Sequence, residues 1–211
     1  MMKSIMLLTR DIPFTAEAQQ VPNVSLERAG HLIDQVAEQF PGGKLACSLA
    51  TQLNANVALG FLDSVSAAEM QDELCHNPDY DRLWSCDCDS RLNPQGRAWM
   101  PVPWLTHEVI LENMGVQLAS DIYPIRPFST MSRLERLTSA IRHGSVAYVA
   151  GKSAVASHAR LIFSPAELQH KIYVHDPNYI ETTGLYDYAD LIDFCRVGTP
   201  WVYDPPTPLE R

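Results

Sequence analysis

The sequence predicts an α+β fold in a single domain over residues 1–211, with N-terminal helices packed on a C-terminal antiparallel sheet. Several stretches before residue 142 place apolar residues three or four positions apart, which is the spacing of one helix face. From Ser145 onward, short runs rich in β-branched and aromatic residues are bounded by turn residues, which is typical of strands. Helices followed by strands, rather than alternating with them, indicate an α+β layout.

The composition is that of an ordinary globular protein. Hydrophobic residues make up 46% and charged residues 19% of the chain, and 211 residues suffice for one sizeable core. A formal net charge of −9 argues against a nucleic-acid-binding protein, which would present a basic face. No window approaches the roughly 20 apolar residues that span a bilayer. We therefore expect neither nucleic acid nor a membrane among the partners.

The start of the chain and the cysteines indicate the compartment. Thr9, Arg10 and Asp11 end the first apolar run too early for the core of a signal peptide. We therefore expect a protein that is cytoplasmic when made and carries no cleaved signal peptide, so that any secretion uses a signal-independent route. The five cysteines, an odd number in a chain of this size, do not indicate a disulfide framework.

The N-terminal half is predicted to contain an irregular arm, residues 1–24, followed by three helices. The first helix begins at a Ser25 N-cap and runs to Phe40, where residues 41–43, Pro-Gly-Gly, stop it. The second runs to about Leu62, and its apolar stripe recurs every four residues. The third covers residues 66–75 and exposes several acidic side chains.

Residues 75–104 are predicted to be an irregular insertion. They contain Cys75, His76, Cys86 and Cys88, which raises the question of a zinc site. A structural zinc site usually shows two pairs of ligands spaced two to four residues apart, and Cys86 and Cys88 are too close for that pattern. We expect a loop with one or two half-buried thiols, a Cys86–Cys88 redox pair being a rarer alternative. The sequence therefore predicts no metal and no cofactor.

The rest of the chain is predicted to begin with helical segments and end with strands. A helix over residues 104–117 is followed by a short strand over 118–123. Another helix begins at a Ser129 or Thr130 cap and is closed by His143 and Gly144, a common helix end. The predicted strands then cover residues 145–150, 158–163, 171–176 and 201–203.

Cys47 lies in the first turn of the second predicted helix, four residues after the Gly42-Gly43 break. The positive end of a helix dipole favours a thiolate, which is the nucleophilic form of cysteine. A buried cysteine is also commonly just a small core residue. His158, which opens one predicted strand, and Asp176, which closes the next, favour the chemical interpretation.

If these two strands are antiparallel neighbours, His158 and Asp176 meet at one edge of the sheet. Asp176 can then accept the N–H of the imidazole and fix its tautomer, so that the other ring nitrogen takes the proton of Cys47. A nucleophile at a helix N-terminus, packed against a sheet that carries a base and its orienting acid, is a workable acyl-transfer site. Asn178 is an alternative orienting residue.

Four segments carry a resemblance to a known family. They are residues 46–50 (Ala-Cys-Ser-Leu-Ala), 144–149 (Gly-Ser-Val-Ala-Tyr-Val), 157–159 (Ser-His-Ala) and 174–177 (Val-His-Asp-Pro). Together they resemble the papain-like cysteine peptidases, in particular the bacterial C39-type peptidases of bacteriocin-processing transporters, over roughly residues 39–204. The resemblance implies a papain-like fold, with Cys47 as nucleophile, His158 as general base and acid, and Asp176 as orienting residue. Tyr186, Tyr188 and Trp201 fill the places of later aromatic residues.

The family usually has a glutamine six residues before the cysteine, which donates a hydrogen bond to the oxyanion. That position is Pro41 here, and the nearest glutamine is Gln39, the candidate oxyanion donor. Gln19, Gln20 or the backbone N–H of Cys47 are the alternatives.

Other histidine and aromatic residues are expected to have structural roles rather than roles in the reaction. Because successive strand residues alternate faces, we expect His175 to point outward beside Asp176. The remaining expectations are surface or helix-cap positions for His107 and His143, and core positions rather than a substrate cleft for Trp104, Tyr148 and Trp201.

The resemblance implies a thiol hydrolase that cleaves peptide bonds in a protein or peptide substrate through an acyl-enzyme, without a cofactor. A free-standing domain of this kind is compatible with a bacterial toxin or effector, whose further partner would be an inhibitor or immunity protein. One alternative is a peptidoglycan hydrolase of the NlpC/P60 type. The other is a binding module without catalytic activity that retains a cysteine on a helix.

Overall fold

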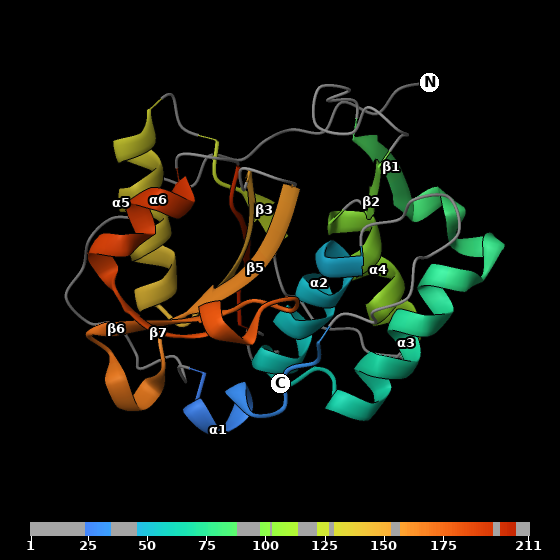
Figure 1. The fold of residues 1–211 in the computed structure, drawn as a ribbon, viewed down its shortest axis with the longest axis horizontal. Helices are drawn as coiled ribbons and strands as arrows, with labels where there is room; N and C mark the ends of the chain where they lie inside the picture. The colour runs from blue at the N-terminus through green and yellow to red at the C-terminus, as the bar shows by residue number, and fades with distance from the viewer. Residues whose placement is uncertain are drawn as a thin grey trace, which may run out of the picture.

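The computed structural model describes residues 24–34, 46–87, 98–101, 103–113, 122–126, 129–152, 157–195 and 199–205. In these residues the predicted α+β layout is confirmed. Helices from the N-terminal half pack on a six-stranded antiparallel sheet formed by the C-terminal part of the chain (Figure 1).

The helices agree with the apolar spacing in most places. The α-helices of the N-terminal half are α1 (Leu26–Ala29), α2 (Ala46–Leu59), α3 (Ser64–His76) and α4 (Pro103–Asn113). α5 (Thr130–Arg142) and α6 (Leu191–Cys195) belong to the C-terminal part. Short 3-10 turns are η2 (Pro78–Leu83), η3 (Ala166–Leu168), η4 (Ile180–Thr182) and η5 (Tyr188–Asp190).

α2 is the central helix, and its sequence accounts for that position. Leu49 and Leu53 are fully buried, and Val57 is almost so, which confirms the predicted apolar stripe. The helix ends before Gly60, whose φ of 82° lies in the left-handed region that glycine adopts without strain. The helix therefore ends at Leu59, three residues before the predicted end at Leu62.

The six strands are β3 (Ile122–Pro124), β4 (Val146–Lys152), β5 (Ser157–Phe163), β6 (Lys171–His175), β7 (Gly184–Asp187) and β8 (Trp201–Tyr203). Their order across the sheet is β3-β8-β4-β5-β6-β7, and each neighbouring pair is antiparallel. The sequence predicts five of these strands, but β7 is an edge strand of four residues that begins with glycine and carries no clear alternation.

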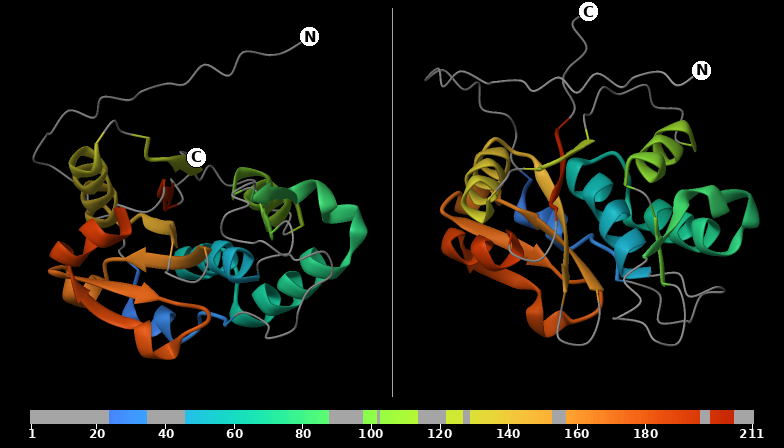
Figure 2. Two further views of the ribbon diagram at one scale, coloured as in Figure 1. Left: turned by 45° about the horizontal axis from the view of Figure 1, so that its top comes forward. Right: turned by 90° about the horizontal axis from the view of Figure 1, so that it is seen from above.

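Both faces of the sheet are covered, as the two further views in Figure 2 show. In β4, Val146 and Tyr148 pack towards α2, whereas Ala147 and Val149 pack in the cluster that contains residues of α5 and α6. α3 and α4 lie on the far side of α2, where a third apolar cluster joins them to it. α2 is thus buried between the sheet and the outer helices.

The described part of residues 75–104 is more regular than the sequence predicts. η2 follows α3, and β1 (Trp84–Asp87) pairs with β2 (Ala98–Pro101) in a two-stranded antiparallel sheet. The expectation of irregular structure is therefore wrong for residues 78–87 and 98–101, whereas residues 88–97 lie outside the described ranges. Both strands have only four residues, which is too short for a period-2 pattern to be recognised.

The predicted helix over residues 25–40 is wrong for residues 30–34. Ser25 is the N-cap, but α1 ends at Ala29, and residues 30–34 are not helical. Gly30 forms the C-cap, and a side chain from α2 binds the backbone of Ile33, which gives the end of the helix a tertiary cause. Residues 35–40 lie outside the described ranges.

The remaining boundaries differ by a few residues. α3 covers the predicted helix over 66–75 and begins at an Asp63 N-cap, whose side chain accepts a hydrogen bond from Ser66 N. The Ser129 cap and the left-handed Gly144 are confirmed at the two ends of α5. None of the described helices is long and apolar enough to cross a bilayer.

Candidate active site

Cys47 is the second residue of α2, and its side chain is 5% exposed. It packs in the apolar cluster between α2 and the sheet, together with Tyr148 of β4 and Ala159 of β5. The next residue, Ser48, shares a 2.9 Å hydrogen bond with the Tyr148 hydroxyl, which ties the start of α2 to the sheet. The cysteine is therefore held in the first helical turn, as the sequence predicts.

His158 and Asp176 meet through the pairing of β5 with β6. These strands are antiparallel, with Leu161 opposite His175, so that the start of β5 lies beside the end of β6. His158 Nε2 lies 2.5 Å from Asp176 Oδ1. The two side chains are 8% and 0% exposed, so the contact is nearly free of water.

Because Nε2 of His158 binds Asp176, the other ring nitrogen, Nδ1, is available for the interaction with Cys47. His158 interacts with the side chain of Cys47 through a hydrogen bond and through charge. Burial of the imidazole opposes its protonation, but the hydrogen bonds and electrostatic interactions with Asp176 and Cys47 outweigh burial and raise the pKa of His158 to about 9. The structure therefore brings together Cys47, His158 and Asp176, which lie far apart in the sequence.

The carboxylate of Asp176 accepts further hydrogen bonds. Oδ1 also accepts from the backbone N–H groups of Asn178 (3.0 Å) and Tyr179 (3.1 Å). Oδ2 accepts from Arg160 Nε at 2.8 Å and from the Thr182 hydroxyl at 2.7 Å. Burial opposes ionisation, yet the hydrogen bonds from His158, Arg160 and Thr182 hold the pKa of the Asp176 carboxyl well below its usual range.

The turn that follows Asp176 packs against both His158 and Asp176. The Tyr179 ring meets the His158 ring edge to face, with ring centroids 5.5 Å apart. Thr183 Oγ1 accepts a hydrogen bond from the backbone N–H of Asp176. The side chain of Asn178, the alternative orienting residue, is exposed, and only its backbone reaches Asp176.

Arg160, Thr182 and Tyr179 are site residues that sequence reasoning missed. The sequence does contain an indication of the role of Arg160. In the antiparallel register that pairs Leu161 with His175, the next opposed pair is Arg160 and Asp176. A basic and an acidic residue directly opposite each other favour contact. Thr182 and Tyr179 reach the site through the turn geometry, for which the sequence carries no comparable signal.

The expectation that His175 points outward is wrong. His175 does alternate with Val174, but α2 covers the face on which it lies, and the residue is 5% exposed. Its Nδ1 lies 3.3 Å from Asn54 Nδ2, and its Nε2 lies 3.8 Å from Asp34 Oδ1. Burial lowers the pKa of His175, and the charges of Asp34 and Asp176 oppose that effect only in part.

His107 is a second correction. It is 4% exposed and meets the Tyr203 ring edge to face at 5.6 Å, so it is a core residue and not a surface or cap residue. His143 is exposed at the C-cap of α5, as predicted. Tyr148 is buried in the core as expected, Trp201 is half-buried beside the same cluster, and the Trp104 side chain lies outside the description.

The oxyanion candidates Gln39, Gln19 and Gln20 lie outside the described residues, as do Pro41 and Cys88.

The structure describes the backbone of Cys86 in β1 but not its side chain. Cys75 is fully buried in the cluster between α2 and the outer helices. Among the described residues, no group of three or more His, Cys, Asp or Glu side chains could hold a metal ion.

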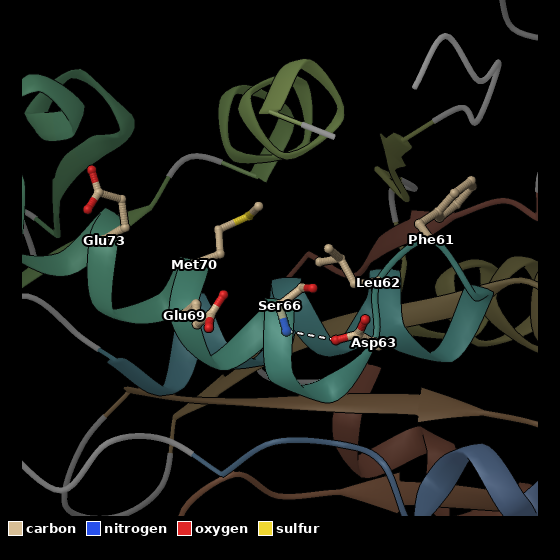
Figure 3. A pocket seen from close by; sticks show the side chains of 7 residues that line it. All are labelled: Phe61, Leu62, Asp63, Ser66, Glu69, Met70 and Glu73. Carbon is tan, nitrogen blue, oxygen red and sulfur yellow. Dashed lines mark hydrogen bonds between the residues drawn. The ribbon is translucent and has the colours of Figure 1, made fainter. Parts of the chain in front are cut away.

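A cavity of about 570 Å³ lies at the other end of α2 (Figure 3). It is lined by Phe61, Leu62, Asp63, Ser66, Glu69, Met70 and Glu73. α2 has 14 residues, so its two ends are about 20 Å apart, and none of the lining residues belongs to the site around Cys47. The Asp63–Ser66 hydrogen bond drawn there is the N-cap of α3.

Comparison with known proteins adds no relative: no protein-family model, no curated protein and no solved structure matches this chain.

Proposed function

We propose that the protein is a thiol hydrolase that uses Cys47, His158 and Asp176. One observation carries the proposal: His158 joins a buried carboxylate on one side to a cysteine in the first turn of a buried helix on the other. An imidazolium next to a cysteine stabilises the thiolate, and the helix N-terminus adds a favourable partial charge.

Each residue has a defined role in the proposed reaction. The Cys47 sulfur attacks a carbonyl carbon, and its proton resides on His158. As the tetrahedral intermediate collapses, His158 gives this proton to the leaving amine, and an acyl-enzyme remains on the sulfur. His158 then takes a proton from water, whose hydroxide releases the acid and frees the thiolate. Asp176 holds the imidazole in one orientation and stabilises its charged form.

A protein or peptide is the proposed substrate, and papain-like cysteine peptidases are the proposed relatives. The support is the order Cys–His–Asp along the chain, with the cysteine on a helix and the other two on neighbouring antiparallel strands. The four sequence segments of the resemblance carry the same residues. Activity as a bacterial effector, restrained by an inhibitor protein, is the proposed setting for this reaction.

The decisive experiment measures the alkylation rate of each cysteine by iodoacetamide as a function of pH, with mass spectrometry locating the label. We expect Cys47 to react below pH 7, faster than the other four cysteines, and His158→Ala to abolish that reaction. His143→Ala, at an exposed helix end, is the matched control and should leave the rate unchanged. A Cys47 that reacts only above about pH 8, as ordinary thiols do, contradicts the proposal and favours a binding module.

A second measurement addresses the reaction. Wild-type protein and Cys47→Ala are incubated with unfolded casein, and new N-termini are counted by mass spectrometry. We expect cleavage by the wild type only. Cleavage of purified peptidoglycan without cleavage of casein would instead favour the NlpC/P60 alternative.

A further inference from the structure

Arg160 binds the same carboxylate as His158. Arg160 Nε donates to Asp176 Oδ2 at 2.8 Å, while His158 Nε2 lies 2.5 Å from Oδ1. The Asp176 side chain has no exposed surface, and that of Arg160 is 29% exposed. The guanidinium also lies over the Phe194 ring of α6, 5.8 Å from its centroid, which limits the positions that Arg160 can adopt.

Five donors fix the orientation of this carboxylate. Three converge on Oδ1, and Arg160 and Thr182 converge on Oδ2. Rotation of the carboxyl group would therefore break contacts on both oxygens. The orientation that presents Oδ1 to His158 therefore depends also on Arg160 and Thr182, which bind the other oxygen.

We propose that Arg160 is a positioning residue of the proposed active site, which aims Asp176 at His158 and limits how strongly that carboxylate holds the proton of His158. The inference rests on the proposed function for its catalytic meaning. The contact of Arg160 with Asp176 exists whether or not Cys47 is a nucleophile.

The charges determine in which direction Arg160 changes the protonation of His158. A carboxylate next to an imidazole favours the imidazolium, whereas a guanidinium on the same carboxylate opposes a second positive charge. Among the described residues, the titratable or charged groups against this pair are Cys47 on α2, Arg160 on β5, His175 on β6 and Tyr179 after it. Removal of the Arg160 charge should therefore let His158 keep its proton to a higher pH.

Three substitutions separate charge from hydrogen bonding. Arg160→Gln places an N–H donor the same number of bonds from the backbone as Arg Nε but removes the charge. Arg160→Lys keeps a positive charge and places a methylene at that position. Arg160→Met removes both charge and donor.

The experiment follows the His158 imidazole signal by NMR during a pH titration of histidine-labelled protein, with assignment from His158→Gln. For Arg160→Gln we expect an upward shift of the titration midpoint by roughly half to one pH unit. For Arg160→Lys we expect a midpoint close to the wild-type value. An unchanged midpoint in Arg160→Gln overturns the proposal.

Arg160→Met tests the positioning. We expect it to shift the midpoint upward and to slow alkylation of Cys47 by iodoacetamide below pH 7, because Oδ2 loses a donor that orients the carboxylate. Alkylation at the wild-type rate contradicts a positioning role.

Thr182→Val keeps the proposal testable if the Arg160 variants do not fold. It removes a neutral donor from the same oxygen and retains the guanidinium. The midpoint should then move less than half as far as the charge effect expected for Arg160→Gln. A shift as large as that charge effect assigns the role to hydrogen bonding alone and overturns the charge assignment.

The same titration in a Cys47→Ala background separates this inference from the proposed function. The midpoint difference caused by Arg160→Gln should persist in that background, because it arises from Asp176. If the wild-type Cys47 is inert to iodoacetamide but this difference is found, the hydrolase proposal fails and the role of Arg160 in orienting and tuning the pair stands.

Discussion

Asp176 is the residue on which the candidate site depends most, because one buried carboxylate holds both the histidine and the turn beside it. It accepts hydrogen bonds from His158, Arg160 and Thr182, and from two backbone N–H groups. The charge of a buried carboxylate is offset by the donors that bind it, and each donor in turn depends on that charge. Replacement of Asp176 by a neutral residue should therefore lower both the stability of the protein and the reactivity of Cys47.

We expect Asp176→Asn to lower the free energy of unfolding at pH 7 by about 3 kcal/mol, because it leaves the buried His158 and the partly buried Arg160 without their shared anion. The depressed pKa of Asp176 means that its contribution is complete above the ordinary carboxyl range and is lost as the pH falls through and below that range. Urea unfolding of both proteins at pH 7 and pH 3.5 should show a smaller difference between them at the lower pH.

The control for this prediction is Asp187→Asn. Asp187 accepts a 2.7 Å hydrogen bond from Lys171 Nζ, but it is 65% exposed. An exposed ion pair of this kind contributes less than about 1 kcal/mol. An equal loss of stability in both variants would show that burial of Asp176 is not the cause.

His175 provides a pH dependence of the opposite kind from His158. Its pKa is lowered by burial, so the unfolded chain binds protons more readily than the folded protein. The contribution of His175 to the free energy of unfolding should therefore be complete well above pH 6.5 and decrease by about 1 kcal/mol as the pH falls from 6.5 to 5. Urea unfolding of wild type and His175→Gln over this range measures the effect.

In His175→Gln this part of the pH dependence should disappear. His143→Gln, at an exposed position, should behave like the wild type. A wild-type slope in His175→Gln would mean that other groups cause the acid sensitivity.

At the scale of elements, the junction between α1 and α2 shows why the predicted first helix fails. The amide of Asn54 on α2 accepts a hydrogen bond from Ile33 N–H and donates one to Ile33 C=O, both at 2.8 Å. A side chain that satisfies both backbone groups of one residue replaces the helical hydrogen bonds of that residue. The periodic apolar residues of 25–40 carry no information about this competitor.

The same junction makes Gly60 sensitive to substitution. Its φ is 82°, and a Cβ atom there would lie 2.1 Å from Arg28 Nη1, which donates to Ala58 C=O. We expect Gly60→Ala to lower the free energy of unfolding by about 1 to 2 kcal/mol, through backbone strain and displacement of Arg28. Thermal unfolding measures this loss.

Gly30→Ala is the matched control. Gly30 has a φ of −71°, which any residue adopts, and the nearest atom to its Cβ would be 3.4 Å away. We expect a change within about 0.5 kcal/mol. If both alanine variants lose the same stability, the positive φ and the Arg28 contact are not responsible.

At the scale of the whole molecule, α2 joins the outer helices to the sheet, and buried polar contacts accompany the apolar ones. The Ser48–Tyr148 hydrogen bond crosses this interface beside Cys47, with both residues at most 2% exposed. We expect Tyr148→Phe and Ser48→Ala each to lower the free energy of unfolding by about 1 kcal/mol. The double variant should cost less than the sum of the two, as measured by a double-mutant cycle.

An additive cycle would show that the hydroxyl groups act independently and that apolar packing alone joins α2 to the sheet. The alkylation rate of Cys47 in Tyr148→Phe gives a second readout, because the contact lies one residue from the sulfur. We expect a slower reaction, because this contact fixes the first turn of α2 against β4.

The sequence by itself determined the α+β class, α2 with Cys47 in its first turn, and the neighbouring strands that bring His158 to Asp176. These features follow from apolar periodicity and from antiparallel geometry, which depend on residues close in the chain. Only the tertiary structure decided that Arg160, Thr182 and Tyr179 surround the pair, that His175 is buried and that the first helix stops at Ala29. These depend on which face another element covers and on which side chain reaches a distant backbone group, and no local pattern of residues records either.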